Sequence, residues 1–140
     1  MRLPLLALLT CLAAPVAATE ASDAPGTIAI DLNTLEPQNG ACRLIFVAEN
    51  ATETDLSALV LEAVLFDTEG RVAALTLLDF EGIPASRLRV RPFDLPGLDC
   101  DALDRLLIND VATCDWATDG PQDCRAALDL RSRAGIELLR

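Results

Sequence analysis

LVLEAVLFDTEGRVAALTLL, residues 59–78, is the stretch of sequence that decides the fold. Two apolar runs flank a short polar segment, in which Asp67 stands at the first position and Gly70 at the fourth position of a type I turn. This chemistry is typical of a β-hairpin whose turn carries a bulge. We therefore predict that residues 59–66 and 72–78 form neighbouring antiparallel strands.

Shorter strand patterns lie on both sides of this hairpin. Residues 27–32 alternate in the manner of a strand, and residues 42–49 form an apolar run after a turn at 37–40. Downstream, residues 87–91 alternate strictly, so three arginines share one face of the expected strand and two aliphatic side chains share the other. Pro92 and Pro96 follow, which favours a position at the edge of a sheet.

The last third of the chain permits two interpretations. Residues 101–113 fit a helix, with Asp101 as its N-cap and Leu103, Leu106 and Leu107 on one face, but they also fit a strand. We favour one helical turn near Asp101 followed by a strand over residues 105–113. A closing strand is expected over residues 126–133, and no element is assigned to residues 135–140.

Short strands separated by turn signals at fairly even spacing predict an all-β fold. We expect an antiparallel, immunoglobulin-like β-sandwich of about seven strands with two disulfides, occupying residues 27–134 as one domain. Residues 19–26 are expected to form a flexible lead and residues 135–140 a C-terminal tail.

The N-terminal segment MRLPLLALLTCLAAPVAA, residues 1–18, has the pattern of an export signal. Arg2 precedes an apolar stretch too short to span a bilayer, and small residues around Ala18 suit cleavage after that position. Lipidation at Cys11 is disfavoured because Thr10 precedes it. We predict Sec-dependent export to the periplasm, with no membrane insertion after the signal is removed.

Four cysteines remain after the signal: Cys42, Cys100, Cys114 and Cys124. If the chain reverses at each connection, Cys42 and Cys100 lie at one end of the domain, whereas Cys114 and Cys124 straddle one turn at the other end. The sequence therefore predicts the pairs Cys42–Cys100 and Cys114–Cys124. In the chain-entropy model these two loops contribute roughly 4 and roughly 3 kcal/mol to stability. The spacing matches neither a Cys₄ zinc site nor a redox-active C-x-x-C motif.

Composition excludes several classes of function. The chain has 22 Asp and Glu, 11 Lys and Arg and no His, giving a formal net charge of −11. Such a charge argues against binding nucleic acid or anionic lipid. Without His there is no Ser-His-Asp triad or Cys-His dyad, and without Lys there is no Ser-Lys pair. We expect no catalytic residues and no cofactor; a hydrolase acting through paired carboxylates is the remaining enzymatic alternative.

One acidic loop is a weak candidate for a cation site. The loop between Cys114 and Cys124 contains three aspartates and a glycine, namely Asp115, Asp119, Asp123 and Gly120. Carboxylates in a constrained loop suit Ca²⁺, but the spacing departs from the calcium-loop pattern, so a solvated acidic loop is favoured.

Two further features are candidates for binding a partner. Trp116, the one tryptophan, would anchor a partner if exposed, although burial against the core is favoured. Arg87, Arg89 and Arg91 would suit an acidic partner, although pairing with carboxylates of the same chain is favoured.

The stretch ACRLIFVAENATETDLSALVLEAVLFDTEGRV, followed by RVRPFDLPGLDC, resembles a group of small exported bacterial proteins labelled "Tat pathway signal sequence domain protein". The resemblance covers about residues 41–114 and implies a periplasmic location and no established activity. This N-terminus has the single Arg2 in place of an Arg-Arg pair, which favours Sec export over Tat. The part from Asn50 through Phe66 to Gly70 is also similar to immunoglobulin-like exported modules of the FxLYD type. Neither resemblance transfers catalytic residues.

These observations together lead to one expected function and one alternative. We expect a non-catalytic periplasmic binding or accessory module that interacts with another periplasmic or membrane-anchored protein. The alternative is a module that binds a divalent cation or small ligand through the loop from Asp115 to Asp123.

Overall fold

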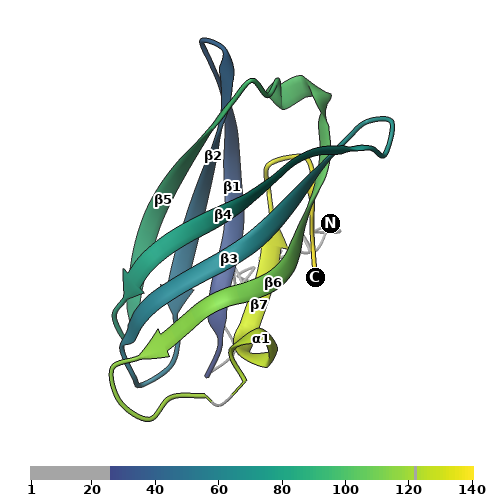
Figure 1. Ribbon diagram of the computed structural model, residues 1–140. Helices are drawn as coiled ribbons and strands as arrows, with labels where there is room; N and C mark the ends of the chain where they lie inside the picture. The colour runs from purple at the N-terminus through teal and green to yellow at the C-terminus, as the bar shows by residue number, and fades with distance from the viewer. Residues whose placement is uncertain (1–25, 122) are drawn as a thin grey trace, which may run out of the picture.

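The computed structural model describes residues 26–121 and 123–140 as a two-layered β-sandwich (Figure 1). The first sheet has the strand order β5-β2-β1-β7 and the second the order β4-β3-β6-β8. The predicted all-β sandwich is confirmed, with eight strands in place of about seven. The predicted signal peptide, Cys11 and nearly all of the predicted lead lie outside the described residues. The elements are β1 (Ile28–Gln38), β2 (Ala41–Asn50), β3 (Leu56–Asp67), β4 (Val72–Ile83), β5 (Arg87–Pro96), η1 (Cys100–Ala102), β6 (Leu103–Trp116), α1 (Cys124–Ala127), β7 (Leu128–Ser132) and β8 (Glu137–Leu139).

The hairpin predicted from residues 59–78 is present as β3 and β4. The N–H of Gly70 donates to the Asp67 carbonyl at 2.9 Å, and Gly70 has a φ of 78°, a conformation that glycine adopts without strain. The register between the two strands shifts between Leu65 and Phe66, so the predicted bulge is confirmed.

Two pairs of strands run parallel within the otherwise antiparallel sheets, a detail that the sequence did not predict. β7 pairs with β1, and β8 pairs with β6, both in parallel. β1 and β7 are separated by an even number of connections, and so are β6 and β8. Strands related in this way run in the same direction when the chain reverses at every connection, so the parallel pairs agree with such reversals. The segment left without an element, residues 135–140, supplies β8.

The last third follows the favoured interpretation. A single 3₁₀ turn at Cys100–Ala102 is capped by the Asp99 carboxylate, and the strand after it runs from Leu103 to Trp116, longer than expected. Before β7, the Asp123 carboxylate caps the short helix α1, which the sequence analysis did not predict.

The core lies between the two sheets and is built from alternate residues of the central strands. Three phenylalanines, Phe46, Phe80 and Phe93, pack edge to face with ring centroids 5.3–5.8 Å apart. Phe46 and Phe80 are fully buried, and the first sits on β2 of one sheet while the second sits on β4 of the other. This cluster therefore ties the two sheets together.

A buried asparagine closes one end of the sandwich. Asn50, fully buried at the end of β2, donates to the carbonyls of Thr54 and Ile83, both at 2.9 Å. Its Oδ1 accepts from the Thr52 N–H at 3.0 Å and from the Thr52 hydroxyl at 2.6 Å. The amide therefore has its full set of partners and joins the β2–β3 loop to the end of β4.

Both predicted disulfides, Cys42–Cys100 and Cys114–Cys124, are confirmed. The first is buried with the core, where it links β2 to η1. Two disulfides indicate an oxidising, extracytoplasmic compartment. Among residues 26–121 and 123–140, no helix is long and apolar enough to cross a membrane.

Candidate functional site

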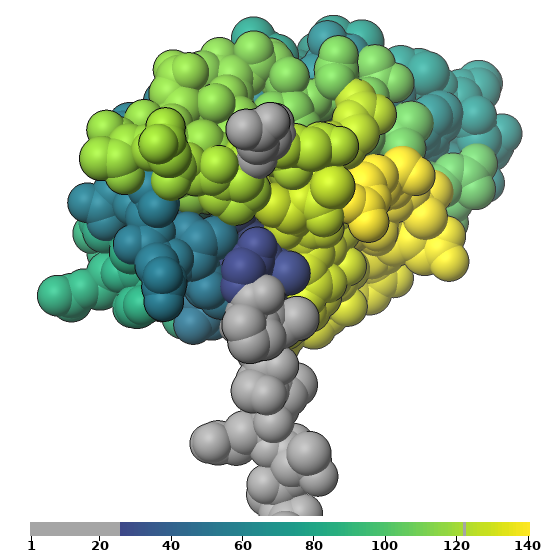
Figure 2. Space-filling view, turned by 90° about the horizontal axis from the view of Figure 1, so that it is seen from below, coloured from purple at the N-terminus to yellow at the C-terminus, as the bar shows by residue number. Residues whose placement is uncertain are grey.

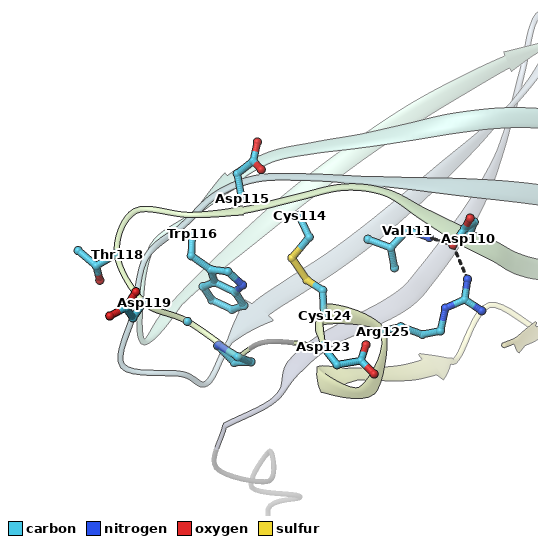
Figure 3. Close-up of a pocket in the computed structure, with 12 residues that line it drawn as sticks. Asp110, Val111, Cys114, Asp115, Trp116, Thr118, Asp119, Asp123, Cys124 and Arg125 are labelled. Carbon is cyan, nitrogen blue, oxygen red and sulfur yellow. Dashed lines mark hydrogen bonds and ion pairs between the residues drawn. A yellow bond between two sulfur atoms is a disulfide. The ribbon is translucent and has the colours of Figure 1, made fainter.

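The acidic loop surrounds an open hollow at one end of the sandwich (Figure 3). The hollow has a volume of about 970 Å³, and the disulfide Cys114–Cys124 forms part of its wall. Figure 2 shows this end, where the yellow-green loop after β6 lies beside the blue loop between β2 and β3. Two hydrogen bonds join the loops: the Ala117 N–H donates to the Asp55 carbonyl, and the Thr54 hydroxyl donates to the Asp119 carbonyl.

The three candidate carboxylates of this loop do not converge. In Figure 3 the side chains of Asp115, Asp119 and Asp123 point in different directions. Asp123 is engaged as the N-cap of α1, where its Oδ1 accepts from the Ala126 N–H at 3.2 Å. No group of three or more His, Cys, Asp or Glu side chains in the described part of the chain is placed to hold a metal ion. The arrangement is that of a solvated acidic loop.

The acid on the opposite wall of the hollow is held in its charged form. The pKa of Asp110 is lowered, first by the N–H of Val111 and then by the guanidinium of Arg125. A general acid needs the opposite shift, so this carboxyl is unsuited to donating a proton at neutral pH.

Trp116 is neither fully exposed nor fully buried. It is half-buried and packs against the core, and its ring lies directly over Gly120. A Cβ at position 120 would stand 2.2 Å from the ring, so glycine is required there. Trp116 therefore serves to fix the loop, although its exposed part still borders the hollow.

The three arginines of β5 lie at a sheet edge, as the prolines predicted. Arg91 bonds to the neighbouring sheet: its Nε donates to the Phe80 carbonyl at 2.9 Å, and its Nη2 lies 3.2 Å from the Glu81 carboxylate. Arg89 donates to the carbonyl of Leu88, and Arg87 is exposed. Arg91 is therefore bonded to groups of its own chain.

A feature that the sequence analysis missed is an apolar face on the outside of the sheet β4-β3-β6-β8. One row crosses all four strands, because Val64 pairs with Leu75 on one side and Leu107 on the other, and Leu107 pairs with Leu139. Within this row Leu75 is 64% and Leu139 37% exposed, whereas Val64 is buried and Leu107 is half-buried. Leu77, two residues beyond Leu75, is 58% exposed. We call this set the apolar face: Val64, Val72, Leu75, Leu77, Leu107 and Leu139.

The other sheet has a smaller counterpart. Leu88 and Val90 of β5 are 52% and 54% exposed, next to each other on the outer side of one edge strand. They do not continue into a row across that sheet, because Leu88 pairs with Glu49, and Val90 pairs with Val47, which in turn pairs with Asp31. Exposed apolar side chains that occur singly are ordinary, whereas large contiguous apolar patches are uncommon on monomeric proteins.

Comparison with known proteins adds no relative: no protein family, curated protein or solved structure matches the chain.

Proposed function

We propose that this protein is a non-catalytic accessory module of the periplasm, and that it binds another exported or membrane-anchored protein through the apolar face. The observation that carries the proposal is the row of apolar side chains across β4, β3, β6 and β8. Its exposed members are Leu75 and Leu139, and Leu77 is exposed beside it. Apolar surface left in water is costly, and covering it is the main driving force for association of proteins.

The surroundings of this face supply the polar rim that a protein contact needs. Glu62, which pairs with Leu77, is engaged with the Asn109 amide, and Arg105 covers the ring of Phe66 with its guanidinium 5.3 Å from the ring centroid. A patch with an apolar centre and charged margins is the usual anatomy of a protein–protein interface. The net charge of −11 favours a partner with a basic surface.

Affinity isolation from an envelope fraction tests this proposal. We expect one protein to co-purify at near-stoichiometric yield with the unaltered chain, and its recovery to fall at least about tenfold with the double variant Leu77→Lys, Leu139→Lys. The matched control is Leu88→Lys, Val90→Lys, which places the same charges at exposed apolar positions of the other sheet.

Two outcomes would contradict the proposal. One is the absence of any reproducible partner; the other is equal loss of the partner from both double variants, which would show that the effect comes from charge alone. Circular dichroism of each variant confirms that the sandwich is intact.

A further inference from the structure

The outer edge of β4 is the least protected edge of the sandwich. Two sheets have four edges, formed here by β5, β7, β4 and β8. β7 has 5 residues and β8 has 3, and β5 contains Pro92 and Pro96. β4 has 12 residues and no proline, and its sequence VAALTLLDFEGI contains no basic residue. Short strands and prolines keep edges from pairing with other chains, and β4 has neither device.

The C-terminal end of the β4 edge is covered by Arg91 of β5, and the rest of the edge is free. Arg91 donates to the Phe80 carbonyl, and Glu81 follows with a φ of 56° at a shift of register. Among the described residues, no strand therefore lies beside the stretch from Val72 to Asp79 on its outer side. The bulge of the hairpin follows Val72 at the start of this stretch, and Leu75 and Leu77 are exposed in its regular part. An unpaired edge of this kind accepts an extended strand.

We propose that the free edge of β4 pairs with the same edge of a second copy of this chain, in antiparallel orientation about a two-fold axis near Leu75. Such an interface must be self-complementary. The free stretch meets this condition: Arg71 precedes it, Asp79 ends it, and the residues between are apolar apart from Thr76. Antiparallel pairing brings Arg71 of each copy to the Asp79 end of the other, with the apolar centres side by side.

Arg71 can take part in this contact although it also forms ion pairs within its own turn. It pairs with Asp67 and Glu69, yet its side chain remains 72% exposed. The resulting dimer has one continuous sheet of eight strands. It leaves the Leu107 and Leu139 end of the apolar face uncovered, so that end stays available to another protein, while Leu75 and Leu77 take part in both proposed contacts.

The charge of the molecule gives the dimer a characteristic salt dependence. Each copy carries a formal charge of −11, so the two copies repel each other at long range while the contact itself is mainly apolar. Salt screens the repulsion, and we expect the dissociation constant of the dimer to fall at least about threefold between 50 and 500 mM NaCl. A basic partner strand would show the opposite trend.

Sedimentation equilibrium of the purified chain at both salt concentrations tests the proposal. We expect a monomer–dimer equilibrium, weakened about tenfold or more by Leu75→Lys, which sets like charges against each other near the axis. Val90→Lys, at a similarly exposed position on β5, should leave the equilibrium unchanged. A second arm uses Leu75→Cys, which should form a disulfide-linked dimer on mild oxidation, because directly opposed strand residues lie within disulfide reach. Val90→Cys is its control.

A chain that stays monomeric at both salt concentrations overturns the proposal, as does a dimer that weakens with salt or that crosslinks equally through positions 75 and 90. A monomer that still captures an envelope protein through Leu139 would reject the dimer and leave the proposed function standing.

Discussion

Replacing Asn50 with alanine tests the polar network that closes one end of the sandwich. The side chain is fully buried and takes part in four hydrogen bonds, with the carbonyls of Thr54 and Ile83 and with the N–H and hydroxyl of Thr52. A net hydrogen bond is worth about 1 kcal/mol, and a buried group left without its partner costs about 1–3 kcal/mol. The Thr52 hydroxyl also lies 3.0 Å from the Thr54 carbonyl and can satisfy it in the variant. We therefore expect Asn50→Ala to lower the free energy of unfolding by about 4 kcal/mol.

Urea unfolding followed by circular dichroism measures this loss. Thr52→Val removes one member of the network and should cost about 1–2 kcal/mol, whereas Asn39→Ala, at an exposed turn position, should change stability by less than about 0.5 kcal/mol. A loss below about 1 kcal/mol for Asn50→Ala, or equal losses for Asn50→Ala and Asn39→Ala, would refute the reasoning.

Two further changes test the loop and the surface charges. Gly120→Ala would place a methyl carbon 2.2 Å from the ring of Trp116, so we expect the indole to be displaced and its fluorescence to shift to longer wavelength. An unchanged emission spectrum would show that the ring does not rest on Gly120. The pKa of Asp94 is lowered, first by its hydrogen bond with Arg43, so its contribution to stability is present above the unfolded pKa of about 4 and is lost as pH falls through the lower folded value. Asp94→Asn should therefore reduce the urea midpoint at pH 7 and have a shrinking effect from pH 4 downward, and a difference that is constant with pH would contradict this assignment.

The hairpin could be predicted because local chemistry specifies it, and the disulfides because the number of strands between the cysteines decides which of them lie at the same end of the domain. The pair Asp67 and Gly70 fixes the turn whatever surrounds it, and the observed bulge follows from the same turn geometry. The cysteine pairing follows from counting reversals of the chain, which holds even where neighbouring strands proved to be parallel.

The parallel pairs and β8 could not be predicted, because they depend on contacts between distant segments. β8 has only 3 residues, Glu137–Leu139, and lies beside β6 through pairs such as Leu106 with Leu138. A strand this short has no periodicity of its own to detect. Its position is decided by the sandwich that it joins.

The apolar face was missed for a related reason. The sequence of β4, VAALTLLDFEGI, is apolar at successive positions and not alternately, which is typical of a strand buried on both faces. Its place at the edge of the second sheet instead leaves Leu75 and Leu77 in solvent. The sequence thus contains the apolar residues, but only the order of strands shows which of them remain uncovered.

Site-specific photo-crosslinking in the producing cell tests the central claim most directly. A photoreactive residue at position 139, on the apolar face but away from the β4 edge, should form an adduct with one other envelope protein. The same residue at position 88, on the outer side of the other sheet, should form none. Failure to obtain a heterologous adduct from position 139, or an equal yield of the same adduct from position 88, would contradict the assignment of the apolar face as the docking surface.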